Sequence, residues 1–122
     1  MNRVTARVIV FLAAVATALT AGCGKPLDVR VQNGTDRPVL VRIERPKKTV
    51  EAGTVAPRRT LKYALNIPAR RLPAKVGIVA GGHARRFTLY GQESAEGPMY
   101  FMVGPEGIVG PRPAPIRYPG EQ

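Results

Sequence analysis

The chain has little of the chemistry that enzyme sites most often use. Its 122 residues include one cysteine, one histidine and no tryptophan. A lone cysteine excludes an internal disulfide, and a zinc site needs three or four clustered ligands. The sequence also lacks a nucleophile motif and a glycine loop that could cradle phosphate. We therefore expect no catalytic residue, no metal and no cofactor, and a domain stabilised by its core alone.

The remaining candidates for catalysis are weakly placed. His83 follows Gly82 at a predicted hairpin turn, where an exposed polar residue is ordinary. Glu93 and Glu96 share one predicted loop, and a carboxylate pair for glycosidic chemistry also needs a cleft that a domain of this size rarely encloses. The sequence favours a protein that is not an enzyme.

No apolar run is long enough to span a bilayer as a helix. The run Val8–Leu19 has 12 residues, whereas a span needs about 20. Arg3 and Arg7 precede this run, and the small residues 20–22 follow it. This order of charged, apolar and small residues is typical of a secretory signal peptide. Residues 1–22 are thus predicted to form a signal helix that is removed.

The residues Leu19-Thr20-Ala21-Gly22-Cys23 resemble the lipobox of bacterial lipoproteins. The resemblance implies that signal peptidase II cleaves between Gly22 and Cys23 and that the Cys23 sulfur carries diacylglycerol. Thr20 departs from the family pattern, which most often has Leu there. Two or three acyl chains on one residue hold a domain at a membrane, since each buried methylene contributes about 0.8 kcal/mol.

The lipobox also implies a location. We expect an exported protein, lipid-anchored to a bacterial membrane on its periplasmic or extracellular face. In some bacteria an Asp after the lipidated cysteine retains the protein in the inner membrane, and Gly24 stands there instead. This favours the outer membrane in a host that has one.

The mature chain alternates apolar and polar residues with a period of two. The segments Leu27–Val31 and Val39–Glu44 each place apolar side chains on one face. We expect them to form two strands of a hairpin, joined through a turn at Asn33-Gly34-Thr35. The same triplet fits a glycosylation site, but a turn is the better interpretation in a bacterial lipoprotein.

Further short strands follow at similar spacing. They are expected near Val50 and in the segments 60–65, 76–80, 85–90, 99–103 and 108–109. Gly81-Gly82 is a strong signal for a two-residue hairpin turn. Seven or eight strands predict an all-β fold: a small antiparallel β-sandwich with immunoglobulin-like architecture at residues 27–110, after a short tether at 23–26.

The C-terminal segment 111–122 has four prolines, which favour an extended conformation over a paired strand. One interpretation is a loosely packed or disordered terminus. The other is a strap that docks an envelope protein partner through Ile116 and Tyr118.

The chain is also unusually basic. The chain has 19 Lys plus Arg against 8 Asp plus Glu, and loss of Arg3 and Arg7 with the leader leaves a net charge of +9. Outside the cytoplasm the available polyanions are anionic lipid, lipopolysaccharide or teichoic acid and acidic glycan, not nucleic acid. The candidate contacts are the dibasic pairs Lys47, Lys48, Arg58, Arg59, Arg70, Arg71, Arg85 and Arg86. Strands that alternate up and down place Arg37 and the pairs 58–59 and 85–86 at one end, with Asp36 and Glu106. They place the pairs 47–48 and 70–71 with Arg45 and Lys75 at the other end, near Glu93 and Glu96, so both ends are expected to be basic.

Two functions remain open at this point. The first is a membrane-anchored interaction or scaffolding module that is not catalytic. The second is a basic surface protein that binds polyanions, for which the alternative interpretation is a solvated basic surface without a dedicated site.

Overall fold

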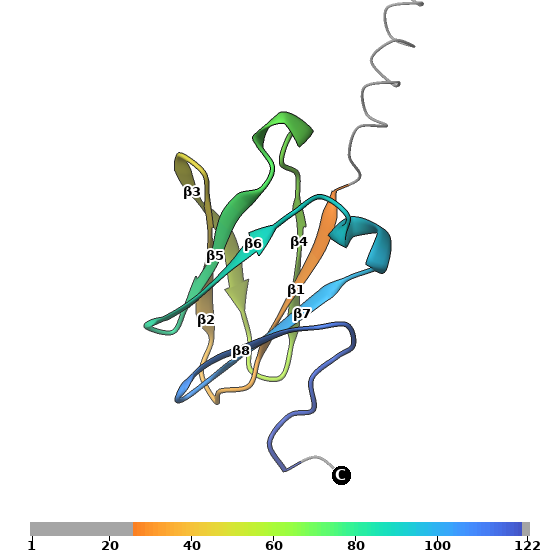
Figure 1. Ribbon diagram of the computed structural model, residues 1–122. Coiled ribbons are helices and arrows are strands. Elements are labelled where there is room, and N and C mark those ends of the chain that lie inside the picture. The colour runs from red at the N-terminus through yellow and green to blue at the C-terminus, as the bar shows by residue number, and fades with distance from the viewer. Residues whose placement is uncertain (1–25, 121–122) are drawn as a thin grey trace, which may run out of the picture.

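The computed structural model describes residues 26–120, which form eight strands in two sheets (Figure 1). The strands are β1 (Leu27–Asn33), β2 (Val39–Arg45), β3 (Lys48–Val55), β4 (Thr60–Leu65), β5 (Ala74–Ala80), β6 (His83–Leu89), β7 (Met99–Gly104) and β8 (Gly107–Arg112). Two short 3-10 turns, η1 (Ala69–Arg71) and η2 (Glu93–Glu96), lie between strands. The predicted signal helix and the predicted lipidation site, Gly22 and Cys23, lie outside the described residues.

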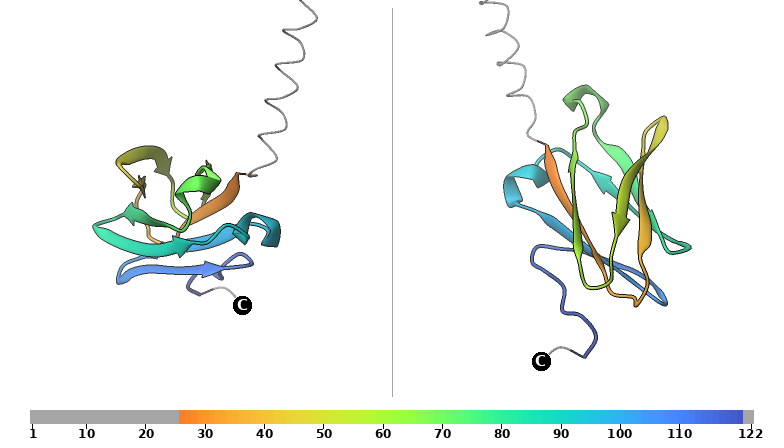
Figure 2. Two further views of the ribbon diagram at one scale, coloured as in Figure 1. Left: turned by 45° about the horizontal axis from the view of Figure 1, so that its top comes forward. Right: turned by 180° about the vertical axis from the view of Figure 1, so that it is seen from behind.

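The two sheets pack face to face as a β-sandwich (Figure 2). The first sheet has the order β4-β1-β7-β8 and the second has the order β3-β2-β5-β6. The inward residues of both sheets make the core, as the period-two pattern predicts. They are Leu27, Val29, Val31, Val41, Ile43, Leu65, Val76, Ile78, Ala80, Leu89, Phe101, Val103 and Ile108. The small all-β sandwich expected from the sequence is confirmed.

Strand direction alternates along the chain, so each end of the sandwich gathers every second loop. All neighbouring strands are antiparallel except β1 and β7, which pair in parallel with Val31 opposite Phe101. One end carries the β2–β3 turn, η1, η2 and the start of β1 (Figure 1). The other end carries the β1–β2 loop, the β3–β4 loop and the β5–β6 and β7–β8 turns.

The predicted hairpin of the first two strands is wrong. β1 pairs with β4 and β7, whereas β2 pairs with β3 and β5 in the opposite sheet. Both strands carry their apolar residues inward, so they face one another across the core instead of lying side by side. The segment between them crosses from one sheet to the other.

The crossover is fixed by the buried side chain of Asn33, which is 0 % exposed. Its Nδ2 donates to the carbonyl oxygens of Arg37 at 2.7 Å and Val55 at 2.9 Å. Its Oδ1 accepts hydrogen bonds from the backbone N and the hydroxyl of Thr35. Every polar atom of this side chain is therefore bonded, and the triplet Asn33-Gly34-Thr35 serves as a buried structural joint.

The predicted hairpin at Gly81-Gly82 is confirmed, with Ala80 opposite His83. Both glycines have positive φ, 59° and 81°, as a two-residue turn of this kind requires. The third strand differs from the expectation. It is a full edge strand of eight residues, Lys48–Val55, where the sequence predicted a short strand near Val50 and then a turn.

The Pro-rich segment is bound to the domain. β8 continues through Pro111 to Arg112, and the chain then turns back along the outer face of the first sheet. Gln32, only 2 % exposed, holds it with two hydrogen bonds. Its Nε2 donates to the Ile116 carbonyl at 2.8 Å, and its Oε1 accepts from the Ile116 N at 2.7 Å. Residues 113–120 are therefore strapped to their own sandwich, in contrast to the loosely packed terminus expected.

Candidate anion-binding surface

The pair Arg70 and Arg71 lies in η1, on a loop that two apolar side chains fix to the core. Ile67 precedes η1 and Leu72 follows it, and both pack partly buried against the core. The turn is closed by hydrogen bonds from Arg71 N to Pro68 O at 2.9 Å and from Leu72 N to Ala69 O at 3.1 Å. With its two flanks anchored in this way, the turn presents both arginines to solvent.

The pair Lys47 and Lys48 lies at the tight turn between β2 and β3. Arg45 pairs with Lys48, so Pro46 and Lys47 are the two central residues of the turn. Proline suits the first of these positions in a type II turn, but the second needs positive φ and usually carries Gly or Asn. Lys47 occupies it with φ 73°. A lysine in this conformation costs about 1–2 kcal/mol relative to an ordinary backbone region.

These two pairs converge with two further cations at one end of the sandwich. We name this set the basic end: Arg45, Lys47, Lys48, Arg70, Arg71 and Lys75. It lines two open grooves that share Arg45, Lys47 and Lys48, with volumes of about 460 Å³ and 340 Å³. Arg45 also joins the two sheets, because its guanidinium donates to the carbonyl of Asn66 at 2.7 Å.

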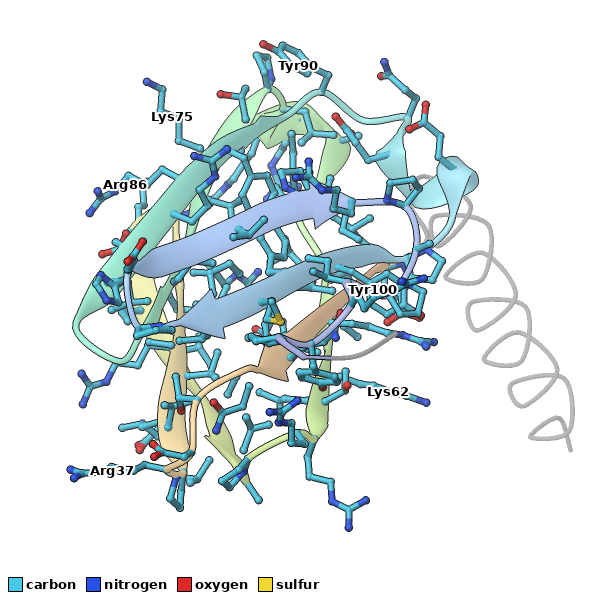
Figure 3. The ribbon with its side chains drawn as sticks, turned by 90° about the horizontal axis from the view of Figure 1, so that it is seen from below. Arg37, Lys62, Lys75, Arg86, Tyr90 and Tyr100 are labelled. Carbon is cyan, nitrogen blue, oxygen red and sulfur yellow. The ribbon has the colours of Figure 1, made fainter. Side chains whose placement is uncertain are left out.

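The groove of 460 Å³ continues along the outer face of the second sheet to Arg86. Gly77 lies between Glu44 and Arg86 in neighbouring strands. Because Gly77 has no side chain, Glu44 and Arg86 meet above it with Oε1 and Nε 3.2 Å apart. A Cβ at Gly77 would lie 2.5 Å from this carboxylate oxygen. Figure 3 shows Arg86 and Lys75 projecting from the same flank of the molecule, opposite Lys62.

Glu44 is the one acidic residue that lines either groove, against seven cations. Among residues 26–120, the ion pairs are Arg30–Asp28 and Arg86–Glu44. Lys47, Lys48, Arg70, Arg71 and Lys75 are exposed and form none within that range. Their charges are consequently available to an external anion, and a field of this sign attracts polyanions with a strength that falls as salt rises.

The other predicted contacts lie elsewhere. Arg58 and Arg59 are in the β3–β4 loop at the opposite end, and the Arg85 Nε donates to the Gly110 carbonyl at 2.9 Å, which links β6 to β8. The expected grouping of Arg85 and Arg86 with that opposite end is wrong for Arg86, which lies in the middle of β6 and lines the groove next to the basic end.

The proposed docking residues contact their own domain. Ile116 is clamped by Gln32, as described above. The Tyr118 ring lies under the Arg58 guanidinium, 5.3 Å from its centroid, and the Tyr118 hydroxyl donates to the Arg59 carbonyl at 3.4 Å. Docking of a partner through Ile116 and Tyr118 stays a prediction.

Two of the three residues considered for catalysis, Glu93 and His83, have structural partners, and Glu96 lines an open groove with Glu93. Both carboxylate oxygens of Glu93 accept backbone hydrogen bonds, from Tyr90 N at 2.9 Å and Gly91 N at 2.8 Å. Burial raises the pKa of Glu93, but these bonds favour the charged form and leave the pKa below its ordinary value. His83 Nε2 lies 3.3 Å from the Pro105 carbonyl and joins two turns. Glu93 and His83 each have a local structural role.

The outer face of the first sheet carries the second ion pair. Arg30 forms a bidentate pair with Asp28 and also donates to the Tyr100 hydroxyl at 3.1 Å. The hydrogen bond from Arg30 lowers the pKa of Asp28 below its ordinary value. Asp28 neutralises Arg30 on this face, while Lys62, opposite Arg30 on β4, is exposed.

Within residues 26–120, no three His, Cys, Asp or Glu side chains gather as a metal site. No helix of that stretch is both long and apolar enough to traverse a bilayer. No family model, no curated protein and no solved structure matches the chain.

Sequence reasoning named the cations but missed what organises them. The contact of Glu44 with Arg86 across Gly77 depends on three strands being neighbours, so the register must be known before it can be seen. The conformation of Lys47 had a usable signal. Pro46 as the first central residue is compatible with a type I turn or with a type II turn, and the type II turn is the one that gives the next position a positive φ.

Proposed function

We propose that this protein is an exported lipoprotein whose β-sandwich binds polyanions through the basic end and catalyses no reaction. The export and the lipid anchor rest on the leader and on the lipobox ending at Cys23. The binding rests on the structure of residues 26–120.

The observation that carries the binding function is the charge imbalance at the two grooves. Seven cations line them and Glu44 is the one acid. A solvated basic surface would intersperse both signs, since like charges held close together repel. Here a fixed turn and a fixed 3-10 turn hold two dibasic pairs together, and Lys47 keeps its place despite an unfavourable φ of 73°. Arg58 at the opposite end has a similar φ of 62°, but its guanidinium lies over the Tyr118 ring of the same chain. Lys47 forms no ion pair within residues 26–120, so its strained position supports a role toward an external group.

The structure supports this function more than docking through the tail. A docking strap needs exposed apolar residues, but Ile116 and Tyr118 are held by Gln32, Arg58 and Arg59 of the same chain. Arg45 of the basic end is bonded to the Asn66 carbonyl, but the other five cations form no ion pair within residues 26–120.

The test compares two charge-matched variants of the chain from Cys23 onward, titrated with inorganic polyphosphate at increasing salt. The first variant changes Lys47, Lys48, Arg70 and Arg71 to Gln. The control changes four exposed cations outside both grooves to Gln: Arg37, Arg59, Lys62 and Arg117. Each lysine or arginine near an anionic surface contributes about 1 kcal/mol.

The first variant should bind roughly 2–4 kcal/mol more weakly at low salt, and the control less than about 1 kcal/mol more weakly. Equal losses in the two variants would show that net charge alone attracts the polyanion, and the proposed site would be wrong.

The anchor is tested separately by Cys23→Ser in cells. The resemblance to lipoproteins predicts that this variant is unprocessed or is released from the membrane fraction. A fully processed Cys23→Ser protein that stays membrane-bound would contradict the lipid anchor.

A further inference from the structure

The basic end and the start of β1 lie at the same end of the sandwich. Leu27 is the first residue of β1 and pairs with Leu65, the last residue of β4. The next residue, Asn66, accepts the hydrogen bond from Arg45 of the basic end. The chain therefore enters the sandwich at the same end as the β2–β3 turn and η1, which carry the cations, and as η2, which carries Glu93 and Glu96 (Figure 1).

We propose that the basic end binds the anionic lipid headgroups of the same membrane that holds the Cys23 lipid anchor. This inference rests on the proposed function and names the polyanion: a phospholipid surface instead of a soluble glycan or polymer. Lipid and charge then act as two signals for one membrane, a combination that binds more stably than either signal alone.

Distance decides which cations can take part. Only two residues, Gly24 and Lys25, separate Cys23 from Pro26, so the reach over these three peptide steps is about 10 Å at most. Charges near a membrane are felt within a Debye length of about 8 Å at physiological salt. The lipid-anchored residue thus holds the basic end within reach of the headgroups.

The opposite end is too far away to contribute. β3 has eight residues, which corresponds to about 26 Å of strand. Arg37, Arg58 and Arg59 lie at that far end, roughly three Debye lengths from the surface when the basic end contacts it. Gly120, the last described residue, also lies at the far end, because its neighbour Pro119 lines a groove with Thr35 and Asp36 of the β1–β2 loop.

The sole cysteine allows a direct test that does not depend on lipidation in cells. The chain from Cys23 onward contains the whole core, which lies between Leu27 and Ile108. It is coupled through Cys23 to maleimide-headgroup lipid in phosphatidylcholine vesicles with or without phosphatidylglycerol. Trace acetylation followed by mass spectrometry then measures the reactivity of Lys47 and Lys48 against Lys62, which lies on β4 outside both grooves.

Anionic vesicles should slow acetylation of Lys47 and Lys48 by about threefold or more relative to Lys62, because each cation near the surface is attracted to it. Neutral vesicles should leave the three lysines at their reactivity in solution. A second protein, Cys23→Ser with Gln122→Cys, is coupled from the far end and should lose most of this protection. Equal protection from both attachment points would overturn the inference, since the position of the tether would then be irrelevant.

A parallel arm with soluble polyphosphate separates the two proposals. Protection of Lys47 and Lys48 by polyphosphate but not by anionic vesicles would overturn the membrane assignment and leave the anion-binding function in place. Protection by neither would overturn both.

Discussion

Replacement of Lys47 by glycine should stabilise the domain and weaken anion binding at the same time. Lys47 is the second central residue of the β2–β3 turn and has φ 73°. Glycine removes the steric cost of this conformation, about 1–2 kcal/mol. Because glycine has more conformational freedom in the unfolded chain, the substitution also lowers the free energy of unfolding by about 0.4–1 kcal/mol. The net expectation is about 0.5–1 kcal/mol of added stability, or a melting temperature higher by a few degrees for a domain of this size.

The affinity of the Lys47→Gly variant for an anionic surface should decrease. Loss of one cation from the basic end removes about 1 kcal/mol of attraction to an anionic surface, close to a fivefold change in Kd. Because removal of a charge also relieves repulsion from neighbouring cations, Lys47→Gln is the matched control: it loses the same charge and keeps the backbone cost. Lys47→Gly should melt above Lys47→Gln, and both should bind more weakly than the unchanged protein.

Thermal unfolding and vesicle co-sedimentation measure the two quantities. The reasoning fails if Lys47→Gly melts no higher than Lys47→Gln, because the turn would then carry no conformational cost. It also fails if both variants bind as tightly as the unchanged protein, because the position would then have no part in the site.

Four further predictions follow from single contacts. Asn33→Asp keeps the shape but turns two donated hydrogen bonds into contacts of a buried carboxylate with carbonyl oxygens; chemical denaturation should show a loss of about 3–5 kcal/mol. Glu44→Gln removes the acid from the basic grooves and should strengthen polyphosphate binding about twofold at low salt, with stability nearly unchanged because the ion pair it breaks is on the surface. Gln32→Ala should release the C-terminal strap, seen as faster trypsin cleavage after Arg117 with the rest of the chain intact. Glu93→Gln should flatten the acid side of the stability profile. The folded-state pKa of Glu93 is lowered, so its stabilising effect is present above the ordinary value of 4.5 and is lost as pH falls through the lowered pKa; melting curves of the two proteins should converge in acid, and a constant gap down to low pH would contradict this.

The strands were predictable because burial in a sandwich imposes a period of two. Phe101 and Val103 alternate with Tyr100 and Met102, and the inward pair is fully buried. The pairing of strands was not predictable in the same way. Inward residues of β1 and β2 give the same pattern whether the strands are neighbours or face each other across the core. The deciding contact is the Asn33 side chain, whose partners Arg37 and Val55 belong to two other segments.

The candidate site was predictable in composition and only partly in arrangement. Alternation of strand direction correctly grouped the pairs 47–48 and 70–71 at one end. It placed Arg86 at the wrong end, because the length of β6 puts this residue well beyond the turn at Gly81-Gly82. The contact of Arg58 with Tyr118 was also out of reach, since it depends on a tail that folds back through a hydrogen bond to Gln32.

Each end of the sandwich holds a cation at positive φ, Arg58 (62°) at the far end and Lys47 (73°) at the basic end. They differ in their contacts, because Arg58 contacts Tyr118 and Pro119 of its own chain, whereas Lys47 forms no ion pair within residues 26–120. At the far end the polar atoms of Asn33 are all bonded and buried, and the strap is clamped beside them. At the basic end all the cations except Arg45 are exposed, and Lys47 is held in an unfavourable conformation. The free energy of unfolding of a domain of about 100 residues is only about 5–15 kcal/mol. The destabilisation caused by repelling charges and a strained turn is a substantial fraction of that value. The start of β1 lies at this same end, so the proposed lipid anchor at Cys23 would bring these exposed charges to an anionic membrane.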